Sequence, residues 1–163
     1  CSLGQNVMIT NFQEYFKLVE YFSEFTKARM GLAMGVYNLI QIFDEKYYRS
    51  LSGGILEAFG KLFYRDLKVY MYPYRDEEKQ VFITSENLKV HPRMKELYKF
   101  FKNNGKLVDI SDFDQEIFHI FSRKVLKMIA KGEKGWQEML PEGISETIVK
   151  KRLFGYTKTR KQT

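Results

Sequence analysis

Cysteine is almost absent from the sequence, because Cys1 is the only one in 163 residues. A single cysteine excludes a disulfide within the chain and a zinc site built from several thiolates. The sequence also lacks an uninterrupted run of about 18 apolar residues, the length that a membrane-spanning helix needs. Its first residues lack the basic, apolar and small-residue order of a secretory signal. We therefore expect a cytoplasmic protein in a reducing compartment, with no membrane partner.

The start of the chain leaves three interpretations open. Residues 1–7 are mostly polar and precede the first periodic segment, and the chain does not begin with methionine. Cys1 could be a residue introduced in cloning, a processed end, or the point at which a longer protein was cut. In the last case, catalytic residues could lie on sequence that precedes Cys1.

The composition is that of a folded globule. Hydrophobic residues make up 44% of the chain and charged residues 29%, which is too apolar for a disordered chain and too interrupted by charge for a membrane protein. A chain of 163 residues fits one domain around one core. We predict a single compact domain over residues 1–156 and a mobile basic tail over residues 157–163.

Positive charge exceeds negative charge. The 27 Lys and Arg residues against 20 Asp and Glu residues give a net charge of +7. This balance favours long-range attraction of nucleotides, nucleic acids or acidic proteins, without choosing among them. Six of the basic residues fall in the last fourteen positions, so the body of the chain is closer to neutral; these are Lys150, Lys151, Arg152, Lys158, Arg160 and Lys161.

Six segments have the three- and four-residue spacing of apolar side chains that is typical of amphipathic helices. The first covers residues 11–28 and carries an aromatic stripe, which favours core packing, with a partner contact as the alternative. This stripe consists of Phe12, Tyr15, Phe16, Val19, Phe22 and Phe25. The other five segments lie at residues 36–47, 55–63, 92–104, 113–131 and 144–153.

Period-two alternation predicts strands between these helices. Residues 67–72 alternate until Pro73, which has no N–H to donate and stops strand pairing. Residues 81–83 repeat the alternation, so we predict an antiparallel hairpin between the two runs. Residues 107–110 predict a third short strand, whereas residues 30–35 (MGLAMG) indicate a flexible link. The predicted fold class is α+β, mainly helical with about six helices and a small antiparallel, hairpin-centred sheet.

A turn of small residues precedes the third predicted helix. Ser52, Gly53 and Gly54 could offer backbone N–H groups and a helix dipole to an anion, with Ser52 as the candidate helix cap. The turn follows a helix rather than a strand, and it lacks both the phosphate loop of nucleoside triphosphatases and a complete dinucleotide fingerprint. A plain turn is therefore favoured, with anion binding as the alternative.

The two histidines predict no metal site. His91 and Arg93 flank Pro92 between the predicted hairpin and a helix, where both side chains could face a phosphate. His119 lies beside the apolar face of a predicted helix, which favours a structural role. Neither histidine has a nearby acidic pair at ligand spacing, and the acidic pairs fall at turns and helix ends, where carboxylates cap the backbone. We predict no metal and no cofactor, and we assign no catalytic residue.

The predicted strand at residues 67–72 is rich in tyrosine and flanked by cations. Tyr70 and Tyr72 share one face with Lys68, and Arg75 follows the strand. Aromatic rings with adjacent cations on one sheet face can stack nucleobases and hold phosphates. The alternative, favoured because helices outnumber strands, is that a second layer of helices covers this face.

Part of the sequence resembles a known family. Residues 53–73 (GGILEAFGKLFYRDLKVYMYP), with residues 120–124 and 136–156, resemble a C-terminal region of bacterial nicotinamide or nicotinate nucleotide adenylyltransferase-like proteins. The resemblance spans most of the chain from Asn11. The His-x-Gly-His and Ser-Ser/Thr-x-Ile-Arg signatures of the adenylyltransferases are absent, so the resemblance implies an accessory domain and carries over no catalytic residue.

Three functions remain open from the sequence. The first is a non-catalytic binding or interaction domain, part of a larger cytoplasmic protein, which contacts an anionic nucleotide, nucleic acid or acidic protein. The second is a nucleotide-handling enzyme, or an accessory domain of a nucleotidyltransferase-like protein. The third is an oligomerisation domain that uses the aromatic first helix. The candidate anion- or partner-binding residues are Ser52, Gly53, Gly54, Lys68, Tyr70, Tyr72, Arg75, His91 and Arg93.

Overall fold

The structure is a computed structural model, and it describes residues 4–76 and 78–157. The chain divides into two compact units, Cys1–Ser111 (unit 1) and Asp112–Thr163 (unit 2). Each unit has a hydrophobic core of its own. This boundary falls within residues 1–156. That these residues form a single domain stays a prediction. Of the predicted tail, residues 158–163 lie outside the described residues.

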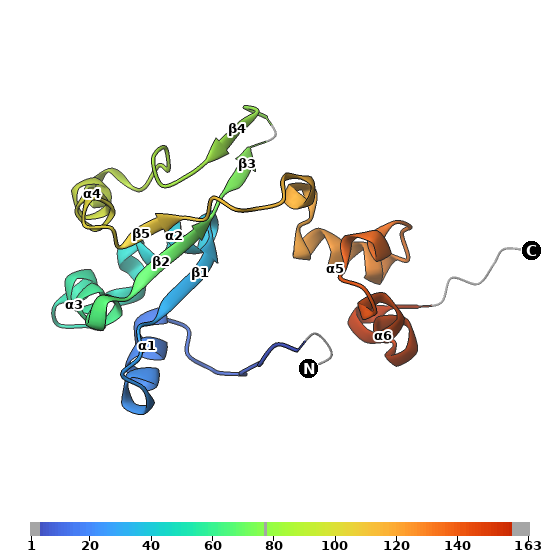
Figure 1. The fold of residues 1–163 in the computed structure, drawn as a ribbon, viewed down its shortest axis with the longest axis horizontal. Coiled ribbons are helices and arrows are strands. Elements are labelled where there is room, and N and C mark those ends of the chain that lie inside the picture. The colour runs from blue at the N-terminus through green and yellow to red at the C-terminus, as the bar shows by residue number, and fades with distance from the viewer. Residues whose placement is uncertain (1–3, 77, 158–163) are drawn as a thin grey trace, which may run out of the picture. The chain divides into compact units, whose positions relative to one another are not determined.

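A parallel sheet of three strands organises unit 1 (Figure 1). Its strands are β1 (Gly31–Gly35), β2 (Lys68–Tyr72) and β5 (Leu107–Asp109), in the order β1-β2-β5. In the central strand β2, Val69 is aligned with Leu32 of β1 and with Leu107 of β5. The α+β prediction therefore holds for the fold class, but the larger sheet is parallel.

The antiparallel hairpin is a separate sheet with a different pair of strands. β3 (Tyr74–Asp76) pairs with β4 (Val81–Ile83), so the predicted pairing of residues 67–72 with residues 81–83 is wrong. Pro73 ends β2, and the chain resumes as β3 before it turns back. The predicted flexible link at residues 30–35 is also wrong, because Gly31–Gly35 forms β1. Pairing with β2 and burial of Met34 outweigh the low strand propensity of its glycines.

Three helices cover one face of the parallel sheet. α2 (Val36–Ile42) and α3 (Gly54–Leu62) connect β1 to β2, and α4 (Lys95–Asn103) lies between β2 and β5. Both connections move across the sheet in the same direction. Because crossover connections between parallel strands are almost always right-handed, the helices of both connections lie on the same face of the sheet. In Figure 1, α3 and α4 lie on the same side of β1 and β2.

Aromatic rings from these helices meet above the sheet. The ring of Phe43 lies 5.0 Å from that of Phe59 and 5.2 Å from that of Tyr98, in edge-to-face contacts. These rings share one core with Val69 and Met71, both fully buried. Burial raises the pKa of the Tyr98 phenol, whose O–H donates to the Ser85 carbonyl oxygen at 2.7 Å.

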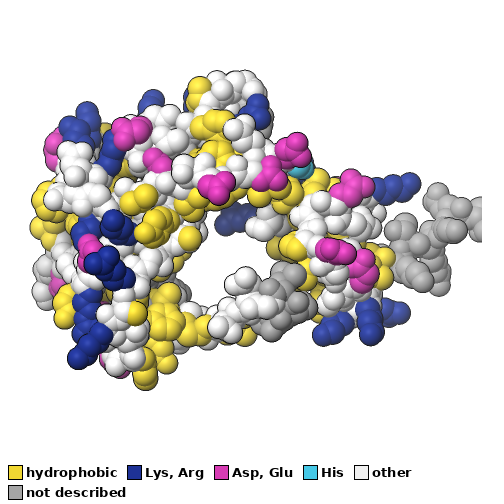
Figure 2. All heavy atoms as spheres, viewed as in Figure 1, with side chains coloured by type: hydrophobic (Ala, Val, Ile, Leu, Met, Phe, Trp, Pro, Cys, Tyr) yellow, Lys and Arg dark blue, Asp and Glu magenta, His cyan; other side chains and the backbone are white. Residues whose placement is uncertain are grey.

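The first helix, α1 (Tyr15–Phe25), is amphipathic but exposes much of its aromatic surface. Phe16 and Val19 are buried in the unit 1 core, whereas Phe25 is 70% exposed and Phe22 36% exposed. The predicted stripe is therefore divided between the core and the surface. The rings of Tyr21 and Phe25 lie 5.0 Å apart, and hydrophobic surface is visible around α1 at the foot of Figure 2.

Unit 2 packs around the single tryptophan of the chain. Trp136 is 1% exposed and shares a small core with Val125, Ile129 and Ile148. Its helices are α5 (Ser122–Lys131) and α6 (Ile144–Lys151). The helix predicted at residues 113–131 is interrupted, because Ile120 and Phe121 have extended dihedral angles.

The described residues contain six α-helices, as predicted. Short 3-10 helices occur at Glu45–Tyr48, Tyr64–Asp66, Pro92–Met94, Gln115–His119, Trp136–Met139 and Leu153–Gly155. Within residues 4–76 and 78–157, no helix is both long and apolar enough to cross a membrane.

Candidate binding surface on the parallel sheet

The parallel sheet has a face that the helices of unit 1 leave uncovered. We call it the open face. Alternation and strand register place seven residues on it: Gly31, Ala33 and Gly35 of β1, Lys68, Tyr70 and Tyr72 of β2, and Val108 of β5. Of the nine candidate residues predicted from the sequence, the structure brings together Lys68, Tyr70 and Tyr72 on this face.

Burial along β2 separates the two faces. Val69 and Met71 are 0% exposed, whereas Tyr70, which lies between them, is 38% exposed. On β1, Met34 is buried, but Gly31, Ala33 and Gly35 are all exposed. Parallel sheets in proteins are almost always covered on both faces. The open face therefore has the character of a contact surface rather than of an ordinary solvent-facing sheet.

The ring of Tyr70 leans across the open face toward β1. A Cβ atom added to Gly31 would lie 2.8 Å from Cε2 of Tyr70, so the ring occupies the space above this glycine. A Cβ atom at Gly35 would meet nothing within 4 Å. The open face thus combines an aromatic ring with bare backbone at Gly35, which a flat ligand group can approach closely.

Cations gather at the amino end of β2. The Lys106 ammonium forms an ion pair with the Asp66 carboxylate at 2.7 Å. The hydrogen bond and charge of Lys106, with the charges of Lys68 and Arg29, lower the pKa of Asp66 below its ordinary value. Three cations thus surround one carboxylate, and the local charge is positive.

The predicted anion turn before α3 already holds a carboxylate of the chain. The Gly53 N–H donates to Oε2 of Glu57 at 3.0 Å, and this bond, with Lys61, lowers the pKa of Glu57. The cap prediction for Ser52 is wrong, because Gly53 occupies the N-cap position. Gly54 lies in the first turn of the helix. Glu57 therefore provides at this turn the negative charge that was expected from a ligand.

The remaining candidates lie elsewhere in unit 1. His91 and Arg93 line a pocket of about 330 Å³ together with Arg49 and two acidic residues. The Arg93 N–H donates to Nδ1 of His91 at 3.4 Å, and its guanidinium lies 3.5 Å from the Glu45 carboxylate. Arg75 is on β3, where it donates to Oε1 of Gln80 at 3.0 Å. A binding role for these residues stays a prediction.

The sequence interpretation missed two groups of residues. The glycines and alanine of β1 were assigned to a link, so their place beside Tyr70 was not expected. Three lysines of α4, together with Lys89, line a separate pocket. Lys95, Lys99 and Lys102 follow the spacing of one helical face, and this pattern was available in the sequence. The loop position of Lys89 left no comparable signal.

Comparison with known proteins identifies no relative: no family model, no curated protein sequence and no solved structure matches the chain. The resemblance to adenylyltransferase-like proteins stays a prediction. In the part of the chain that the structure describes, no group of three His, Cys, Asp or Glu side chains is placed to hold a metal ion.

One substitution in two backgrounds tests the position of the Tyr70 ring. Alanine is favoured over glycine within a strand by about 0.5–1 kcal/mol. Gly31→Ala should fall short of that gain in the parent chain, because its methyl group must displace the ring, and should come closer to it in Tyr70→Ala, which lacks the ring. Urea denaturation measures the free energy of unfolding in both backgrounds. Equal effects of Gly31→Ala with and without the ring would contradict the placement of Tyr70 over Gly31.

Proposed function

We propose that the chain is a non-catalytic binding domain whose open face binds single-stranded nucleic acid. The observation that carries the proposal is a sheet face that the helices of unit 1 leave uncovered, on which Tyr70 and the small residues of β1 are exposed. The exposed ring supplies a stacking surface for a nucleobase. Lys68, two residues earlier on the same face, supplies charge for a phosphate.

The chemistry of the open face favours a nucleobase with its phosphate over an acidic protein. Acidic side chains would engage the cations but would leave the Tyr70 ring without a flat partner. Nucleobases use both features, and stacking tolerates any base because each has a π-face. The net charge of +7 supports encounter with a polyanion. A place in a reducing, cytoplasmic compartment is part of the same proposal.

Fluorescence anisotropy with a labelled oligothymidylate tests this function. Tyr70→Ala should weaken binding by about tenfold, because stacking on one aromatic ring contributes about 1–3 kcal/mol. Lys68→Ala should weaken binding less than Tyr70→Ala does. It should also reduce the salt dependence of the affinity by an amount that corresponds to about one phosphate contact. Asp66→Asn should strengthen binding, because it removes the only carboxylate of the cation cluster, and Asn tolerates the positive φ of 61° at this position.

Two variants serve as controls. Tyr64→Ala removes a tyrosine that is 54% exposed outside the sheet, and Lys17→Ala removes a charge from α1, which packs on α3. Both should leave the affinity unchanged. The proposal fails if the oligonucleotide does not bind, or if Tyr70→Ala binds as tightly as the parent chain. Equal displacement of the oligonucleotide by polyglutamate would also reject it, in favour of an acidic protein.

A second function, self-association through α1, is favoured by the exposed aromatic cluster of Phe12, Tyr21, Phe22 and Phe25. Apolar patches of this kind mark protein contacts. Sedimentation velocity should then show a concentration-dependent dimer that Phe25→Glu abolishes. Val81→Glu, a matched change at a residue that is 43% exposed on β4, should retain the dimer. A strict monomer at every concentration excludes this function.

A further inference from the structure

A pocket of about 470 Å³ lies between α4 and the loop at residues 84–92 in unit 1. Its volume is within the range of small-molecule sites. The loop wall is held in place by Ser85, whose N–H and hydroxyl both donate to the Asp109 carboxylate, at 2.8 and 2.6 Å. Tyr98 fixes the same residue from α4, because its hydroxyl donates to the Ser85 carbonyl oxygen. These hydrogen bonds therefore fix the position of the loop that forms one wall of the pocket.

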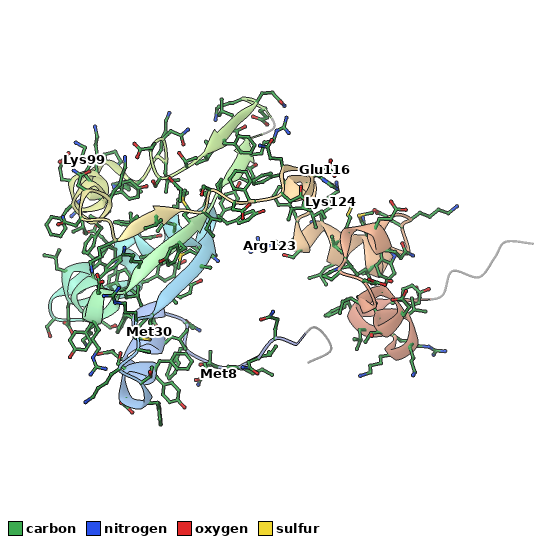
Figure 3. The ribbon with its side chains drawn as sticks, viewed as in Figure 1. Met8, Met30, Lys99, Glu116, Arg123 and Lys124 are labelled. Carbon is green, nitrogen blue, oxygen red and sulfur yellow. The ribbon has the colours of Figure 1, made fainter. Side chains whose placement is uncertain are left out.

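Lysines surround the pocket from two directions. Lys95, Lys99 and Lys102 project from one face of α4, and Lys89 comes from the loop. Lys99, labelled in Figure 3, pairs with Glu96 at 2.8 Å, and Lys102 pairs with Glu86. Among the described residues, Lys89 and Lys95 form no ion pair. These two ammonium groups are the ones available to a bound anion.

The floor of the pocket is apolar. Leu88 and Val90 line it, and both pack against the main core of unit 1. Tyr98 also lines the pocket, with its hydroxyl already engaged by the Ser85 carbonyl oxygen. A ligand in this pocket would therefore meet cations at the rim and aliphatic side chains at the base. This arrangement suits an anion with an attached apolar group better than a free inorganic ion.

We propose that this pocket binds a phosphorylated small molecule that carries an apolar or aromatic group. Lys89 and Lys95 hold the phosphate, and Leu88 and Val90 contact the apolar part. Lysine binds phosphate as a point charge, and a dianionic phosphate can accept from both ammonium groups at once. The site is separate from the open face, so it can exist whether or not the chain binds nucleic acid.

Calorimetric titration of the full chain with phenyl phosphate and with inorganic phosphate tests the proposal. Phenyl phosphate should bind about tenfold more tightly, because its ring buries apolar surface on the floor. The double change Lys89→Ala with Lys95→Ala should weaken both ligands by about tenfold or more. Val90→Thr, which keeps the shape of the side chain, should weaken phenyl phosphate alone.

The control is Lys17→Ala, which removes a lysine of α1 that does not line the pocket and should change neither affinity. Circular dichroism of each variant checks that it is folded. The proposal is overturned if neither ligand binds saturably below about 10 mM. It is also overturned if the double lysine variant binds both ligands as tightly as the parent chain, or if Lys17→Ala weakens them to the same extent.

Discussion

The pairing of β2 with two parallel neighbours is the constraint on which the rest of unit 1 depends. Parallel strands cannot be joined by a tight turn, so each step across the sheet requires a long connection that contains helices. The two connections of this chain step in the same direction, which leaves their helices on one face. The buried core of Val69, Met71 and the helical aromatic rings follows from this arrangement, and so does the exposure of Tyr70 on the other face.

The helices and β2 could be predicted from the sequence because their signals are local. Apolar spacing located all six α-helices, and alternation located the strand with Tyr70 and Tyr72 on one face. The partners of β2 could not be predicted in this way, because β1 and β5 are distant in the chain. The glycines of β1 have low strand propensity, and only pairing with β2 makes this segment a strand. The spacing of apolar residues along a helix likewise does not show which of them face the core. On α1, for example, Phe16 is buried and Phe25 is exposed.

The two sites proposed for unit 1 differ in the ligand that their residues favour. On the open face, an exposed ring and the bare backbone at Gly35 favour a flat group, with Lys68 at its side. In the pocket beside α4, two lysines that form no ion pair among the described residues, together with aliphatic side chains, favour a phosphate with an apolar substituent. The predicted residues Lys68, Tyr70 and Tyr72 belong to the first site. The second was hidden in the sequence because Lys89 reaches it only through the fold, by way of the loop that Ser85 anchors to Asp109.

Backbone amide NMR tests most directly whether the open face binds single-stranded nucleic acid. An oligothymidylate is titrated into the full chain, and the amide shifts of every assigned residue are followed. If the open face is the binding site, the largest changes fall on Gly31–Gly35 and Lys68–Tyr72, and they are lost in Tyr70→Ala. Changes confined to α1 or α5, with β1 and β2 unaffected, would contradict binding at the open face.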